Sequence, residues 1–164
     1  MSGQVGLWYG AQLAPDGSVY HEGEYLEIGG ALDQDLFLKA LKRAMAEAEA
    51  YRLRLRVEGG KPYQYVDDSQ DRPIHVADLG DEPDPLSAAR AWMDADLRGP
   101  VEIVDRPLTA HALFRLGPDH FVWYQRAHHI AVDGASFAVF SEQVARIYTK
   151  LRNGTDADHE ALVR

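Results

Sequence analysis

The stretch from Arg126 to Phe137 constrains the fold of this chain more than any other segment. It reads Arg-Ala-His-His-Ile-Ala-Val-Asp-Gly-Ala-Ser-Phe and contains the pattern His-His-x-x-x-Asp-Gly. An apolar and aromatic run (121–124) precedes it, and a segment with helical periodicity follows it. The pattern predicts a strand, a tight turn at Gly134 and then a helix. A histidine at the end of a strand is held by the sheet while it faces open space, so a fold can place a base there.

The length and composition limit the class of protein. The 164 residues suffice for one domain with its own core. The net charge of −9 argues against a nucleic-acid partner or an anionic membrane surface. The absence of cysteine removes disulfides, thiolate metal sites and cysteine nucleophiles, and it fits a reducing, cytoplasmic compartment. No signal peptide is visible, and no apolar run reaches the roughly 20 residues of a membrane helix.

Three segments have the periodicity of amphipathic helices. The first starts at Asp33, which can cap it, and runs to about Glu49. The second starts at Asp84-Pro85, a cap followed by a first-turn proline, and stops at Gly99-Pro100. The third starts near Ser136 and ends at residues 153–154, and a shorter helix is predicted at residues 5–13. The tryptophans are expected in the core: Trp8, Trp92 and Trp123.

Several shorter segments have the composition of strands. The segment Tyr51–Val57 alternates, which predicts one polar face that carries three arginines, and residues 58–61 form a hairpin turn after it. The other predicted strands cover residues 20–28, 62–66, 74–76, 111–116 and 121–127. Together with the helices, they predict an α+β fold: a two-layer sandwich in which helices cover a mixed β-sheet.

These residues resemble the condensation domains of nonribosomal peptide synthetases and, more broadly, the chloramphenicol-acetyltransferase-like superfamily. The central motif matches at His128, His129, Asp133 and Gly134. Residues 4–8 (Gln-Val-Gly-Leu-Trp) are similar to the family's opening Ala-Gln-x-Gly-Leu-Trp element. Residues 50–55 (Ala-Tyr-Arg-Leu-Arg-Leu) resemble its Leu-Arg-x-Arg-Phe element, with Tyr and Leu in place of the usual Leu and Phe.

The resemblance covers nearly all of the chain, but the chain covers only part of the family. It implies that residues 1–154 are the N-terminal lobe of a condensation domain with a chloramphenicol-acetyltransferase-like fold. Residues 155–164 would be a polar tail toward a missing C-terminal lobe. The stretch 123–137, together with residues 64–68, is similar to the siderophore subgroup that includes enterobactin synthase. That subgroup uses an aryl donor such as 2,3-dihydroxybenzoyl.

The implied reaction is amide bond formation between a carrier-tethered acyl thioester donor and a carrier-tethered aminoacyl acceptor. The expected partners are upstream and downstream peptidyl or aryl carrier domains and the missing C-terminal lobe, with no nucleic acid and no membrane. No cofactor is expected to bind directly, because phosphopantetheine arms come with the carrier domains. An activated thioester needs no covalent enzyme nucleophile, which agrees with the absence of cysteine and of a Gly-x-Ser-x-Gly element. We expect little activity from the isolated lobe.

The resemblance assigns the chemistry to the second histidine. His129 either accepts the amine proton or holds the amine by a hydrogen bond. His128 should face away from it, because adjacent strand residues point to opposite faces, and we interpret it as structural.

The remaining motif residues are interpreted as mainly structural. Asp133 pairs with Arg52 or with an arginine of the missing lobe. Gly134 allows an unusual backbone angle or the close approach of a substrate. Ser136 caps the last helix, with a contact to a pantetheine arm or thioester as the alternative.

Two rival interpretations stay open at this point. A chloramphenicol-type acyltransferase has a similar motif and acts as a trimer, and a carrier-docking module would keep the motif without catalysis. A metal site is disfavoured although His129 and Asp133 are four residues apart, because Gly134 and the β-branched residues around it oppose a helix. No third ligand stands at a suggestive spacing, so no metal is expected.

Overall fold

A computed structural model of the chain describes residues 20–69, 73–99, 102–132 and 134–155. The predicted helix at residues 5–13, the opening element at residues 4–8 and Asp133 lie outside the described residues. A four-stranded sheet forms the centre, in the order β1 (His21–Gly29), β6 (His120–His128), β5 (Thr109–Gly117) and β4 (Ile74–Asp78). Because β4 runs parallel to β5 while the other neighbours are antiparallel, the sheet is mixed, as predicted.

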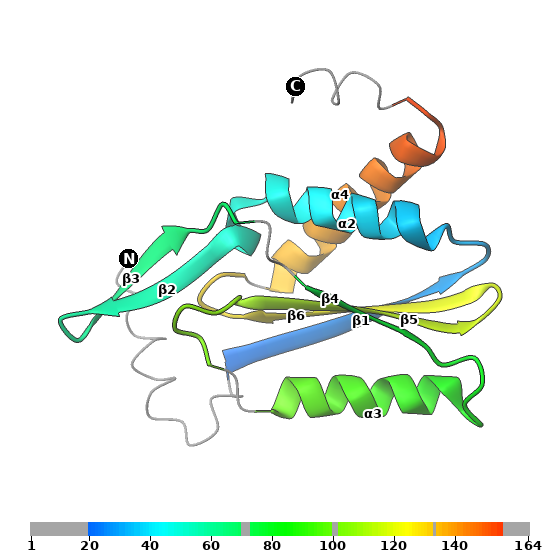
Figure 1. The fold of residues 1–164 in the computed structure, drawn as a ribbon, viewed down its shortest axis with the longest axis horizontal. Coiled ribbons are helices and arrows are strands. Elements are labelled where there is room, and N and C mark those ends of the chain that lie inside the picture. Colours follow the sequence, from blue (N-terminus) through cyan, green and yellow to red (C-terminus); the bar gives the residue numbers. More distant parts are fainter. Residues whose placement is uncertain (1–19, 70–72, 100–101, 133, 156–164) are drawn as a thin grey trace.

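Helices cover both faces of this sheet (Figure 1). Helices α2 (Gln34–Glu47) and α4 (Gly134–Arg152) pack on one face and α3 (Pro85–Arg98) on the other. The α+β class is therefore confirmed, whereas the two-layer arrangement is wrong. The reason lies in β6, where Trp123 faces the core under α2 and α4 while Val122 faces the core under α3. An apolar run without alternation is typical of a strand that is buried on both faces.

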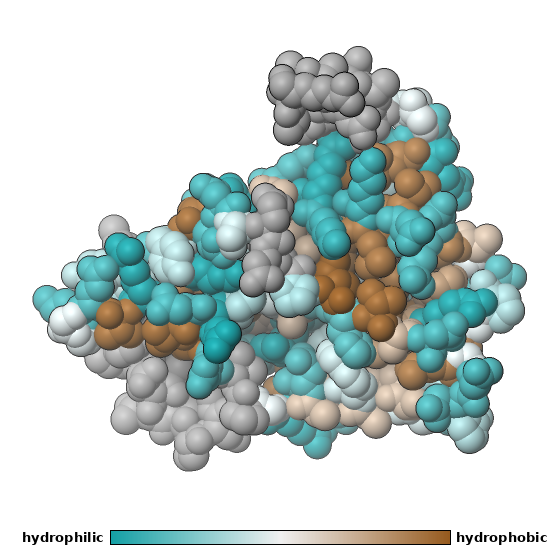
Figure 2. All heavy atoms as spheres, viewed as in Figure 1, coloured by the Kyte–Doolittle hydropathy of each residue, from teal (hydrophilic) through white to brown (hydrophobic). Residues whose placement is uncertain are grey.

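The helix starts follow the predicted capping. The Leu36 N–H donates to the Asp33 carboxylate at 3.0 Å, which makes Asp33 the N-cap of α2. The Ser87 N–H donates to Asp84 at 3.0 Å before the first turn of α3. Figure 2 shows hydrophobic side chains gathered between α2 and the sheet, below the mainly hydrophilic outer side of the helix. These contacts fix the helices on the sheet that carries the motif.

A separate two-stranded sheet, β2 (Leu53–Glu58) and β3 (Lys61–Val66), projects beside the main sheet (Figure 1). Its turn uses Gly59 and Gly60 at φ 57° and 77°, as a two-residue hairpin requires. The predicted strand start at Tyr51 is wrong, because a short 3₁₀ helix, η2 (Glu49–Arg52), precedes β2. The Tyr51 ring stacks on Phe140 of α4 with 3.8 Å between ring centroids, so this residue belongs to the main core.

Candidate functional site

His129 follows the last residue of β6 and is held by the edge strand β1. Its backbone N–H donates to the Tyr20 carbonyl at 2.8 Å, which continues the β1–β6 ladder by one bond. Its Nε2 lies 2.9 Å from a carboxylate oxygen of Glu22, and 34% of its side chain is exposed. The structure therefore places a fixed but accessible imidazole at the end of the sheet, as the sequence predicts for a base.

His128 has the opposite surroundings. It is 1% exposed, and its Nδ1 accepts the Ile130 N–H at 3.1 Å. The His21 ring meets it edge-on at 4.9 Å between centroids. Burial, assisted by His21 and the nearby charges, lowers the pKa of His128 to about 4, so the ring is neutral at physiological pH. These contacts agree with a structural role.

Glu22 is the site residue that the sequence analysis missed. It comes from the second position of β1, and its Oε2 lies 3.4 Å from where a Cβ on Gly134 would stand. A side chain at position 134 would therefore contact this carboxylate. Only the antiparallel pairing of β1 with β6 brings residue 22 beside residue 129, and that pairing joins segments about a hundred residues apart. No local pattern signals such a contact.

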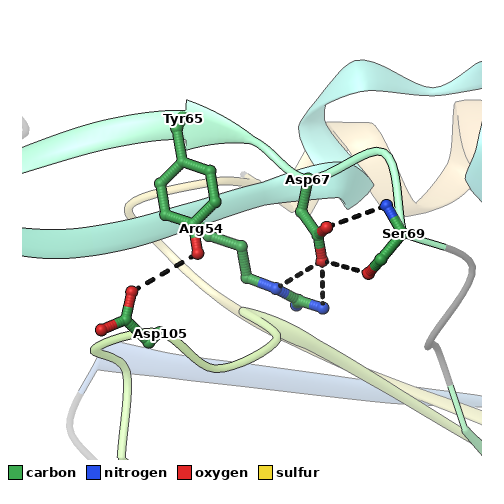
Figure 3. A network of polar contacts seen from close by, with 5 residues as sticks. All are labelled: Arg54, Tyr65, Asp67, Ser69 and Asp105. Carbon is green, nitrogen blue, oxygen red and sulfur yellow. Dashed lines mark hydrogen bonds and ion pairs between the residues drawn. The ribbon is translucent and has the colours of Figure 1, made fainter.

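The arginines of the second motif are not on one exposed face. Arg54 is 5% exposed and its Nη2 lies 3.0 Å from Asp67, which corrects the predicted polar face (Figure 3). Asp67 also accepts hydrogen bonds from Ser69, and these bonds, together with Arg54, lower the pKa of its carboxyl group. Arg52 instead pairs with Asp68 at 2.5 Å. Because Asp133 lies outside the described residues, its pairing with Arg52 stays a prediction.

The last helix starts earlier than predicted. Helix α4 begins at Gly134, so Ser136 is its third residue and not its N-cap. The last residue of the motif, Gly134, is thus already part of the helix. Ser136 is half-buried in the first turn of α4.

The last turn of α3 supports the motif from the other face of the sheet. Arg126 donates from Nε to Asp96 at 2.6 Å, and the Tyr124 hydroxyl donates to the same carboxylate at 3.0 Å. Burial and this carboxylate raise the pKa of the Tyr124 hydroxyl well above its usual value. The pair joins α3 to β6 two residues before His128.

A cavity of about 660 Å³ opens near the start of β5. Its wall includes Met45, Pro107 and three arginines. Each of those arginines has a carboxylate partner within the described part of the chain: Arg54 with Asp67, Arg126 with Asp96, and Arg106 with Glu102. The cavity therefore presents little unbalanced positive charge to an occupant.

Two further observations concern cofactors and membranes. Among the residues that the structure describes, no three acidic or histidine side chains come together in a way that could hold a metal ion. In the same residues, no helix has the length and apolar character that a membrane span requires.

Comparisons with known proteins agree with this geometry. The condensation domain family matches residues 1–162. The chain is 44% identical over 154 residues to the dimodular nonribosomal peptide synthase of Bacillus subtilis (strain 168), covering 94% of this chain and 6% of that protein. It is 33% identical over 150 residues to enterobactin synthase component F of Escherichia coli (strain K12), covering 90% and 12%.

A solved structure has the same fold. The starter condensation domain of rhizomide synthetase RzmA superposes with a TM-score of 0.88 at 34% identity, covering 94% of this chain and 38% of that one. Fold, motif and family match together define a condensation domain of the type found in nonribosomal peptide synthetases. The chain belongs to this family, and it spans a small part of the curated relatives and about two fifths of the solved domain.

Proposed function

We propose that residues 1–154 form the N-terminal lobe of a condensation domain that joins a carrier-tethered acyl thioester to a carrier-tethered amine. The observation that carries the proposal is the placement of His129, which is fixed by Tyr20 and Glu22 and yet one third exposed. In this proposal a second lobe supplies the other wall of the site, and residues 155–164 lead toward it. The partial coverage of the solved condensation domain supports this division.

Two contributions from the protein can accelerate this reaction: positioning of the reactants and acid–base catalysis. Holding two tethered reactants in line can contribute about 7–11 kcal/mol in well-aligned cases. Acid–base assistance contributes roughly 10²–10⁴ in rate. His129 provides the acid–base catalysis by accepting the proton that the amine nitrogen loses as the C–N bond forms. Upstream and downstream carrier domains bring the reactants on phosphopantetheine arms.

The donor is proposed to be an uncharged acyl group, and the siderophore-like pattern favours an aryl group such as 2,3-dihydroxybenzoyl. The similarity to enterobactin synthase component F supports this subgroup.

The test is formation of the amide product, detected by intact mass. The chain is joined to its second lobe and mixed with a carrier loaded with 2,3-dihydroxybenzoate and a carrier loaded with an amino acid. We expect product with both lobes, little with this lobe alone, and none after His129→Ala. A set of acyl donors tests the aryl assignment separately. Undiminished product with His129→Ala would overturn the catalytic role of His129.

A further inference from the structure

We propose that Glu22 is a catalytic residue whose carboxylate binds the acceptor as an ammonium ion beside His129. The inference rests on the proposed function, and it adds a second proton-handling group and a charge preference to the site. Its basis is the contact between the Glu22 carboxylate and His129 Nε2 at 2.9 Å, with 34% of the histidine and 41% of the glutamate side chain exposed.

The geometry gives Glu22 a fixed place at the reacting end of the sheet. Two neighbouring residues hold His129: Tyr20, which directly precedes β1, through its carbonyl, and Glu22 of β1 through its carboxylate. The other carboxylate oxygen lies against Gly134, where α4 begins. The carboxylate is therefore confined between the base and the first turn of the helix, and it keeps an accessible edge for a substrate group.

The local charge favours a cation at this position. Glu22 contacts Nε2 of His129, and among the described residues it forms no ion pair with a lysine or arginine. A second carboxylate, Glu24, follows two residues later on the same side of β1 and is bound to the neutral Gln125 at 2.7 Å. The arginine on the neighbouring strand, Arg126, is committed to Asp96 on the opposite face. A protonated amine would thus meet a carboxylate that no lysine or arginine of the described part of the chain neutralises.

The proton balance of the reaction gives this carboxylate a task. An α-amino group has an ordinary pKa of about 8, so much of the acceptor arrives as an ammonium ion. Its nitrogen loses two protons on the way to the amide. One passes to the departing thiolate, which leaves as the thiol, and the other is released to solvent. A single imidazole carries one of these protons at a time, and a neighbouring carboxylate binds the ammonium and assists the loss of the first proton before the amine attacks the thioester.

The experiment compares Glu22→Gln with wild type in the chain joined to its second lobe, using an aminoacyl pantetheine thioester as acceptor. Glutamine keeps the shape and an acceptor for a histidine N–H, but it removes the charge. A residue that only orients His129 would tolerate this change, whereas an ammonium-binding residue would not. We expect KM for the acceptor to rise roughly tenfold to a hundredfold, the effect of losing a charged hydrogen bond, with KM for the donor unchanged. Glu22→Asp, which keeps the charge, should restore part of the affinity.

The same strand offers a matched control. Glu27 lies 3.1 Å from His120 at the other end of the β1–β6 ladder, and Glu27→Gln should leave both KM values unchanged. A hydroxyacyl pantetheine inhibitor, which has no ammonium group, should bind wild type and Glu22→Gln equally well. An unchanged acceptor KM in Glu22→Gln, or equal weakening of amine and hydroxyl ligands, would overturn the inference. Absence of product from wild type would instead count against the proposed function.

Discussion

The two ends of the β1–β6 ladder carry the same kind of side-chain pair in different surroundings. At one end, Glu22 contacts His129 at 2.9 Å, and at the other end Glu27 contacts His120 at 3.1 Å. Both pairs join the same two strands, and both are partly exposed. The pairing of residue types by itself therefore cannot distinguish a functional site from a surface contact.

The difference lies in what surrounds each pair. His129 continues the ladder through Tyr20 and is followed by a buried turn and the start of α4. His120 begins β6 next to a turn, and 45% of its side chain is exposed. A base needs a fixed position and neighbouring groups that hold the reactants, and the proposed function assigns both to the His129 end. Four predictions test this contrast between the ends, from the largest expected effect to the smallest.

The largest effect is expected from the two histidines themselves. In the chain joined to its second lobe, His129→Gln should lower the rate of amide formation by roughly 10²–10⁴, because acid–base assistance is lost. His120→Gln should leave the rate unchanged, since the half-exposed ring contacts Glu27 at the end of the ladder away from the motif. Single-turnover rates measured with loaded carriers decide this, and equal losses in both variants would contradict the contrast.

Loss of an ion pair should also cost more stability at the motif end of the sheet than at the other end. Asp96→Ala leaves Arg126 buried without its carboxylate and should lower the free energy of unfolding by about 3 kcal/mol. Asp78→Ala removes the exposed pair with Arg115 toward the other end of the sheet and should change stability little. Urea unfolding of both variants provides the comparison. Similar midpoints would show that burial at the motif end does not strengthen the dependence on a partner.

Acidification should lower the free energy of unfolding, mainly through the buried His128 at the motif end of the sheet. The pKa of His128 is about 4 in the folded state against 6.5 for a free side chain, so the unfolded chain binds more protons between these values. The contribution of neutral His128 to the free energy of unfolding is therefore fully present above about pH 6.5. It is lost as the pH falls toward 4, by a total on the order of 3 kcal/mol. His111, whose pKa burial lowers to about 3, extends the loss to lower pH.

The measurement is urea unfolding at a series of pH values, with His128→Gln as the test and His120→Gln as the control. The slope of stability against pH should be shallower in His128→Gln and unchanged in His120→Gln. Parallel curves for wild type and His128→Gln would refute the assignment of this slope to His128.

The smallest effect separates two glycines of β1. A Cβ at Gly23, near the motif end, would stand 3.1 Å from the Tyr124 ring and 3.2 Å from Leu97, whereas nothing lies within 4 Å of one at Gly29. Gly23→Ala should therefore destabilise the fold by about 1–3 kcal/mol through overpacking. Gly29→Ala should be close to neutral. Thermal unfolding tests the difference, and a neutral Gly23→Ala would show that α3 can move away from the sheet.

Much of the local structure could be predicted from the sequence. The Asp33 and Asp84 caps, the Gly59-Gly60 hairpin and the strand that leads into the motif are all where the local patterns predict them. Such features depend on interactions within a few residues, such as a side-chain oxygen that accepts a nearby N–H. The His-His-x-x-x-Asp-Gly motif also identified the family without long-range information.

The tertiary structure decided what depends on residues far apart in the chain. It placed helices on both faces of the sheet, buried Arg54 against Asp67, and brought Glu22 to His129. The alternating pattern of β2 could not distinguish a solvated arginine from a buried one, because the difference comes from a carboxylate on another segment. The sequence by itself thus determined most of the elements and pointed to the histidine that is proposed as the base. The pairing of β1 with β6 decided which carboxylate lies beside that base, because strand register is a long-range property.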